Sequence, residues 1–261
     1  MSDLEGRVVL VTKATEFVGP ASVASCLSAG ARVVAQDPSF AEDEAVNAFA
    51  LAHPGVTCIA EDEADALVAA ALDVTGRLDG LVANEGYPAV RAAVETATEE
   101  QMRHGLEAMV VTPYRLIGAA VAAMKRRGQG RGQGRGQGLG QGLGQGRIVV
   151  ASSAAPLRGL PNYSLYVTAR GAQNAMVVAL AKELARSGIT INAVAPNFIA
   201  TPAYFPDSLQ QDAAAMAKIT AQIPLGRLGT PGEVSGLVAF LLSDAAGFMT
   251  GHVAPVAGGW A

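Results

Sequence analysis

The chain has 261 residues, half of them hydrophobic, and a formal net charge of −4. This length and composition suffice for a substantial core, and we expect one domain over residues 1–261. The small acidic charge, with no basic block in the segments of expected secondary structure, argues against nucleic acid or an anionic membrane as partners. A small neutral or weakly polar molecule is the expected ligand.

The N-terminal segment MSDLEGRVVLVT carries only a short apolar run interrupted by charge, so we expect a cytoplasmic protein without a signal peptide or membrane span. Cys26 and Cys58 are the only cysteines, and their spacing is not that of metal ligands. The three histidines are equally scattered along the chain. We therefore predict two reduced thiols and no metal site.

Short apolar segments alternate with longer helical ones along the chain. We predict strands at 8–11, 32–36, 80–83, 147–151 and 189–195, and helices at 20–28, 41–51, 64–74, 99–126, 163–186 and 231–242. Strands without a clean apolar and polar alternation are typical of a parallel sheet covered on both faces. The order predicts an α/β fold, a single Rossmann-like, doubly wound parallel sheet flanked by helices, with its ligand site beyond the carboxyl ends of the strands.

The loop after the first predicted strand, residues 12–19, lacks glycines that a dinucleotide-binding turn needs. Lys13 and Phe17 stand where the first two glycines are expected, and only Gly19 remains, for close packing of the helix. Lys13 as a phosphate ligand is the opposing interpretation, but one ammonium group does not restore the space that Phe17 takes. We predict no nicotinamide cofactor, and we interpret Asp37 as a turn cap rather than a ribose ligand.

Residues 128–146 have glycine at every even position. Such a segment loses too much backbone entropy to fold into a packed element, so we predict a flexible Gly/Gln-rich surface loop there. An RNA-binding tract of glycine and arginine is a weaker alternative, because the segment has no aromatic residues to stack on bases.

Three polar residues follow the strand predicted at 147–151. Ser153 lies at the strand end, and Tyr166 and Arg170 lie one turn apart on the next helix. A tyrosine with a pKa of about 10 is a poor base at neutral pH, but a fixed guanidinium favours its phenolate. Each residue alone is weak support for a site, and Ser152 is a neighbouring alternative serine. Together they predict Tyr166 as general base and Ser153 as a hydrogen-bond donor to a substrate hydroxyl.

These patterns resemble the halohydrin dehalogenases (haloalcohol dehalogenases), a cofactor-independent branch of the short-chain dehydrogenase/reductase superfamily. That branch has Thr-x4-Phe-x-Gly in place of the glycine-rich loop and Ser-x12-Tyr-x3-Arg in place of the usual Ser, Tyr and Lys. The matching residues are Thr12, Phe17 and Gly19, and Ser153, Tyr166 and Arg170.

The resemblance implies that vicinal haloalcohols are converted to epoxides and halide without a cofactor, and that azide, cyanide or nitrite open epoxides in reverse. It also implies a homotetramer. The implied residues of the halide and substrate pocket are Thr12, Phe17, Pro196, Asn197, Phe198, Ile199, Tyr204 and Phe205.

Within that pocket, backbone N–H groups of Phe198 and Ile199 would suit a large, weakly hydrated anion. Tyr204 and Phe205 have the alternative of packing a lid. Glu85, after the strand at 80–83, is at a position where the resemblance allows an acidic residue that orients Arg170. An exposed loop carboxylate is the alternative.

Two other functions stay open from the sequence. An NAD(P)-dependent short-chain oxidoreductase with a degenerate cofactor loop would bind NADH or NADPH measurably. A catalytically silent relative that acts as a binding module would show neither cofactor binding nor turnover, and the intact trio of Ser153, Tyr166 and Arg170 argues against it.

Overall fold

The computed structural model describes residues 3–86, 88–130, 146–202 and 204–261. Its centre is a parallel sheet of seven strands in the order β3-β2-β1-β4-β5-β6-β7. The predicted Rossmann-like α/β fold is confirmed. The strands are β1 Val8–Val11, β2 Arg32–Gln36, β3 Thr57–Ile59, β4 Gly80–Ala83, β5 Gly146–Ala151, β6 Ile189–Pro196 and β7 Val253–Val256.

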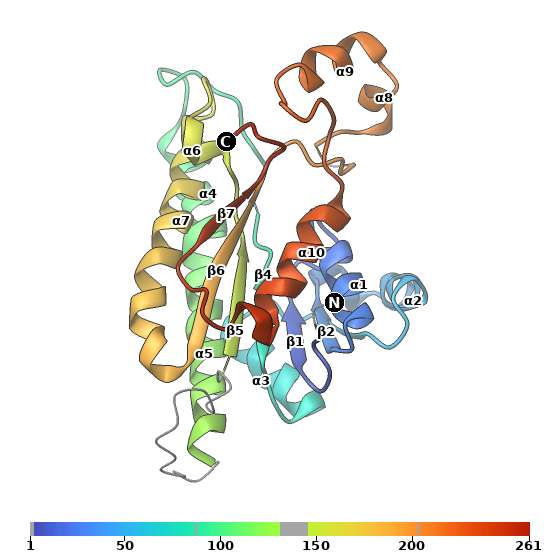
Figure 1. Cartoon of the computed structure of the whole chain (residues 1–261), viewed down its shortest axis with the longest axis vertical. Helices are drawn as coiled ribbons and strands as arrows, with labels where there is room; N and C mark the ends of the chain where they lie inside the picture. The colour runs from blue at the N-terminus through green and yellow to red at the C-terminus, as the bar shows by residue number, and fades with distance from the viewer. Residues whose placement is uncertain (1–2, 87, 131–145, 203) are drawn as a thin grey trace.

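Helices cover both faces of this sheet (Figure 1). Val8 and Leu10 of β1 pack in the cluster under one helical layer, and Val9 and Val11 pack in the cluster under the other. Strands buried on both sides explain the continuous apolar runs in the sequence. The first layer comprises α3 Ala64–Thr75, α5 Thr112–Gly130 and α7 Ser164–Leu184, and the second comprises α1 Gly19–Ser28, α2 Asp43–Ala52 and α10 Pro231–Leu242.

The helix predicted at 99–126 consists of α4 Glu99–Leu106, a π-helical turn η2 Glu107–Val111, and α5. By length and composition alone, Glu99–Arg126 could cross a membrane. Its apolar residues Leu116, Ile117 and Met124 are buried in the core beside the sheet, so it is a core helix of this fold.

The sequence prediction needs several corrections. It omitted β3 and β7 at the two edges of the sheet. Of the predicted Gly/Gln-rich loop, residues 128–130 belong to α5 and residue 146 begins β5, while 131–145 lie outside the described residues. The short elements that it also omitted are η1 Pro38–Ala41, α6 Ala155–Arg158, η3 Ala185–Ser187, α8 Asp207–Gln210, α9 Ala213–Thr220 and η4 Asp244–Ala246.

The carboxyl ends of the parallel strands β1, β4, β5 and β6 meet at one edge of the sheet, and the segments that follow them surround one region. Beyond the end of β6, the chain forms the small helical pair α8 and α9, which projects from this edge (Figure 1). The candidate site therefore lies where an open parallel sheet binds its ligands.

Candidate active site

Ser153 lies just after β5, where the chain turns into the short helix α6. The backbone N–H of Ala155 donates to Ser153 Oγ at 3.1 Å, which fixes the oxygen and leaves its O–H free to donate elsewhere. The neighbouring Ser152 donates its hydroxyl to Asn174 Oδ1 on α7 instead. Ser153 lines a cavity together with Tyr166, whereas Ser152 does not line it. Ser153 is thus the better placed of the two serines.

Arg170 is almost completely buried, with 1 % of its surface exposed. Its Nη1 donates to three uncharged oxygens: Glu85 O at 3.1 Å, Ala151 O at 2.8 Å and Gln173 Oε1 at 2.9 Å. Among the described residues, no carboxylate forms an ion pair with the guanidinium. The charge is held rigidly and left uncompensated, so it favours an anion nearby.

Tyr166 is that neighbour, because the Arg170 Cζ lies 5.4 Å from the centroid of its ring. Burial is the largest single influence and raises the pKa of Tyr166. The Arg170 charge and hydrogen bonds with Ser153, Arg170 and Tyr204 outweigh it, so that the pKa is lowered from its ordinary value. A phenol with a lowered pKa can serve as a general base nearer neutral pH.

A cavity of about 590 Å³ opens in front of Ser153 and Tyr166. It contains most of the predicted halide and substrate residues: Phe17, Pro196, Asn197, Phe198, Ile199, Tyr204 and Phe205. Apolar and aromatic side chains predominate on its wall. Such a cavity suits a small, weakly polar substrate held by a few polar groups.

The predicted backbone anion site is altered at Phe198. Its N–H donates to Asn197 Oδ1 at 3.0 Å, so this group is already engaged, contrary to the prediction. Phe198 has a φ of 55°, which non-glycine residues rarely adopt. Its ring meets Trp260 edge-on at 5.7 Å between centroids, and Arg158 covers Trp260 at 5.0 Å. Trp260 therefore packs on the pocket segment of its own chain.

Thr12 and Glu85 lie apart from the main cavity. Thr12 is buried, and its Oγ1 accepts from the N–H of Asn84 at 3.1 Å. Glu85 is buried, and burial raises the pKa of its carboxyl, while Thr12 and the Lys13 charge act in the lowering direction. Glu85 reaches Arg170 only through its backbone carbonyl, so the predicted orienting role of the carboxylate is not what the geometry shows.

The loop between β1 and α1 keeps the backbone of a glycine-rich turn without its glycines. Lys13 and Phe17 have φ values of 44° and 49°, in the left-handed region that glycine adopts readily. At Gly19, an added Cβ would lie 2.6 Å from Lys13 O and 2.7 Å from Ala14 O, so a side chain there would clash with the loop. The close helix packing predicted for Gly19 is confirmed.

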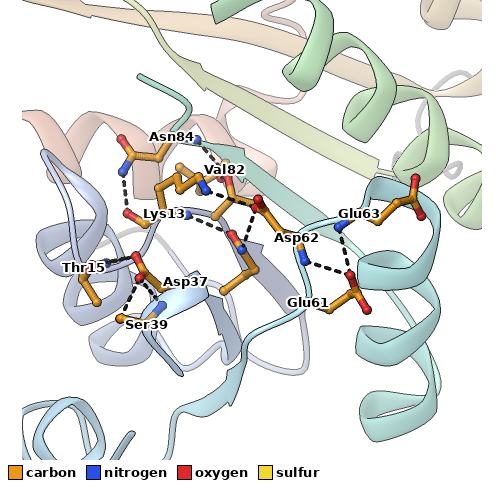
Figure 2. Close-up of polar contacts among 11 residues, drawn as sticks. Lys13, Thr15, Asp37, Ser39, Glu61, Asp62, Glu63, Val82 and Asn84 are labelled. Carbon is orange, nitrogen blue, oxygen red and sulfur yellow. Dashed lines mark hydrogen bonds and ion pairs between the residues drawn. The ribbon is translucent and has the colours of Figure 1, made fainter. Parts of the chain in front are cut away.

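Polar side chains beside this loop are joined to one another by hydrogen bonds and an ion pair (Figure 2). Lys13 Nζ pairs with Asp62 Oδ1 at 3.0 Å, and Gln36 Nε2 donates to the same oxygen at 3.2 Å. Asp37 Oδ2 accepts from the Thr15 hydroxyl at 2.6 Å, and Oδ1 accepts from the N–H of Ser39 at 3.0 Å.

The predicted cap role of Asp37 is confirmed, and both of its carboxylate oxygens have partners. With the Phe17 ring at a glycine position and Lys13 paired to Asp62, the residues here do not fit a dinucleotide.

Other residues of the site carried no motif in the sequence. Gln173 holds Arg170, and Asn84 Nδ2 donates to Lys13 O at 3.0 Å and to Glu16 O at 2.9 Å. The only signals that could have indicated them are positional. Gln173 lies about one helical turn after Arg170, and Asn84 follows β4 directly. The other cavity residues that the prediction did not assign are Ala89, Arg91, Ala155, Leu160, Tyr163 and Gln222.

Comparisons with known proteins bear on this site. Residues 7–132 match the family model of short chain dehydrogenases, and residues 136–261 match a model described as enoyl-(acyl carrier protein) reductase. An uncharacterized oxidoreductase of Methylorubrum extorquens is 34 % identical over 99 % of both chains.

Two solved structures are also similar to this chain. One is a dehalogenation enzyme, 44 % identical with a TM-score of 0.90 over 99 % of both chains. The other is a halohydrin dehalogenase bound to ethyl (2S)-oxiran-2-ylacetate, 30 % identical with a TM-score of 0.86 over 97 % of this chain and 96 % of that one.

Proposed function

The chain belongs to the short-chain dehydrogenase/reductase superfamily, and within it we propose that it is a cofactor-independent halohydrin dehalogenase, a carbon-halide lyase. One observation carries the proposal: the cavity that holds Ser153 and Tyr166 is walled by Phe17, from the loop whose glycines a cofactor would need. Tyr166, the proposed base, thus lies in a cavity beside a loop whose side chains do not fit a dinucleotide. The similarity to a halohydrin dehalogenase of known structure supports the same proposal.

The proposed reaction begins with a vicinal haloalcohol whose hydroxyl oxygen accepts a hydrogen bond from Ser153. The Tyr166 phenolate takes the hydroxyl proton, and the alkoxide attacks the adjacent carbon from the side opposite the halogen. The new C–O bond closes the epoxide as the C–X bond breaks and its electron pair leaves with the halide. The Arg170 charge stabilises the phenolate before this proton transfer.

The leaving halide enters the aromatic part of the cavity, near Phe17 and Phe198. Ring edges carry partial positive charge and suit a large, weakly hydrated anion. In reverse, an anion such as azide, cyanide or nitrite opens an epoxide, and the protonated Tyr166 returns its proton to the alkoxide. The same residues therefore account for both directions of the reaction.

The deciding assay uses the purified chain without any added cofactor. It is incubated with a vicinal bromoalcohol, and bromide, proton and epoxide are measured together. We expect all three to appear in equal amounts. If no haloalcohol releases halide while NADH or NADPH binds, the chain is an oxidoreductase with a degenerate loop, as the name of its relative in Methylorubrum extorquens would suggest.

A further inference from the structure

Arg91, in the segment between β4 and α4, lines the cavity that also holds Ser153 and Tyr166. Among the described residues of this wall, Arg91 is the only arginine, and no aspartate, glutamate, lysine or histidine is present. The neighbouring cavity, of about 780 Å³, is lined by Glu16 as well as Arg170 and so has charges of both signs. Arg91 therefore gives the cavity of the proposed reaction a positive wall.

Arg91 lies at the solvent side of this cavity. It is an exposed residue, whereas Ser153 and Tyr166 are at most 9 % exposed. The backbone beside Arg91 is fixed, because the N–H of Ala92 donates to Asn162 O, just before α7, at 2.8 Å. Arg91 thus stands at the rim, and the reacting groups lie at the buried end.

The guanidinium of Arg91 forms no ion pair with a carboxylate in the part of the chain that the structure describes. Arg158, by contrast, covers the Trp260 ring and donates to Trp260 O at 2.8 Å, and Arg227 pairs with Glu233 at 2.7 Å. Structural contacts account for those two arginines. The charge of Arg91 is available to a ligand.

The cavity is larger than the reacting atoms require. Its volume of about 590 Å³ falls within the range of pockets that hold drug-sized ligands. The hydroxyl, the two reacting carbons and the halogen need only the part beside Ser153 and Tyr166. A longer substrate can extend to the rim beside Ala89 and Leu160, which pack in the same apolar cluster as Tyr166.

The chemistry of Arg91 favours one kind of ligand group at this rim. A guanidinium donates two parallel N–H bonds to a carboxylate, and a spherical halide makes no use of that planar fork. Gln222, another exposed residue of the wall, is uncharged, and its Nε2 donates to Lys218 O at 3.3 Å. The rim therefore suits a carboxylate.

We propose that Arg91 is a specificity-determining residue, and that this chain prefers vicinal haloalcohols, and the epoxides formed from them, whose carbon chain ends in a carboxylate. The proposal rests on the proposed function, since it names the substrate class of the same site. Arg91 binds the carboxylate, and Ser153 and Tyr166 act on the hydroxyl.

The test compares two acids, 4-bromo-3-hydroxybutanoate and 6-bromo-5-hydroxyhexanoate, each with its neutral amide of nearly the same shape. For at least one chain length, the acid-to-amide ratio of kcat/KM for bromide release should fall about fivefold in Arg91→Gln, mainly through KM, as expected for an exposed pair. Any loss common to both substrates cancels in this ratio. The acid preference of the wild type should shrink as salt is added, because salt screens the pair.

Two further variants and a control separate charge from shape. Arg91→Lys should keep part of the acid preference, and Arg91→Glu should lower the ratio below that of Arg91→Gln. Arg186→Gln removes the same charge from exposed Arg186 in η3, which precedes β6 at the opposite edge of the sheet, and should leave the ratio unchanged. An unchanged ratio in Arg91→Gln would overturn the proposal, and a higher KM for azide in that variant would then assign Arg91 to the small anion.

A second readout needs no turnover. Trp260 is the single tryptophan of the chain, and its ring centroid lies 5.7 Å from that of Phe198 on the cavity wall, so its fluorescence reports ligands in the cavity. The bromine-free acids 3-hydroxybutanoate and 5-hydroxyhexanoate are titrated beside their amides. Tighter binding of the acid that is lost in Arg91→Gln supports the proposal, and equal binding, or none, contradicts it. If the wild type releases no bromide, the proposed function fails while this titration still decides the role of Arg91.

Discussion

Two residues of the loop after β1, Lys13 and Phe17, lie in different environments. Lys13 forms an ion pair with Asp62 and a hydrogen bond with Gln36 (Figure 2), whereas Phe17 lines a largely apolar cavity. Both residues have the same left-handed backbone. The two parts of the loop therefore differ in their side chains and not in their backbone. The part at Lys13, the polar half, makes structural contacts, and the part at Phe17, the cavity half, lines the proposed site.

The difference between the two halves can be tested by substitution. Changes in the cavity half should alter turnover and leave stability nearly unchanged. Changes in the polar half should alter stability and leave turnover per folded molecule unchanged.

Tyr166→Phe should have the largest effect, because it removes the group that takes the proton. We expect halide release to fall by about 10³-fold, within the range that general-base catalysis contributes. Tyr114→Phe is the control, since that phenol is 56 % exposed on α5 and does not line the cavity. Halide assays at saturating haloalcohol measure both. Near-normal turnover in Tyr166→Phe would mean that another residue is the base.

Arg170→Lys should reduce kcat/KM by about 10²-fold, because misplacement of a catalytic group by about 1 Å has that effect. A lysine keeps a charge but not the planar group that donates to Glu85 O, Ala151 O and Gln173 Oε1. With the charge less well held, the Tyr166 pKa should rise and the acidic limb of the pH profile should move to higher pH. Exposed Arg186, in η3, provides the control Arg186→Lys, which should leave the profile in place.

Asp37→Asn tests the polar half. Burial raises the pKa of Asp37, but hydrogen bonds from Thr15 and Ser39 lower it overall. A lowered pKa stabilises the fold above the unfolded value of about 4 and loses that stabilisation as the pH falls through the folded value. The variant should lose about 2 kcal/mol of unfolding free energy at pH 7, and less at more acidic pH.

Urea unfolding at several pH values measures this difference, and Asp73→Asn, at an exposed site on α3, should show none of it. Halide release per folded molecule should match the wild type in both variants. A pH-independent loss in Asp37→Asn, or a loss of turnover, would contradict the separation of the two halves.

The sequence indicated most of the cavity half because its signals are local. Tyr166 and Arg170 are one helical turn apart, and Phe17 replaces a glycine whose role depends on backbone space. What it could not indicate depends on side-chain direction or on distant contacts. Glu85 contacts Arg170 through its backbone carbonyl, and Tyr204 lines the same cavity as Tyr166 although 38 residues separate them in the sequence.

The two edge strands were omitted from the sequence prediction for physical reasons as well. β3 has three residues of intermediate burial, too few to show a pattern. β7 contains Pro255, and proline is tolerated at an edge but is a signal against a strand in sequence. At Phe198, the choice of Asn197 Oδ1 as partner for the N–H is a rotamer effect that no spacing reveals.

The smallest effect separates backbone strain from charge at Lys13. Lys13→Gly and Lys13→Ala both lose the contact with Asp62, so their difference isolates the positive φ of 44°. The glycine variant should be more stable by about 1 kcal/mol, because the relief of a left-handed side chain exceeds the entropy that glycine adds to the unfolded chain. Glu16, whose φ is not positive, should show the opposite order for its Gly and Ala variants in urea. Equal stability of the two Lys13 variants would mean that residue 13 leaves its left-handed conformation once lysine is replaced. The positive φ that Lys13 shares with Phe17 would then be a consequence of the side chains.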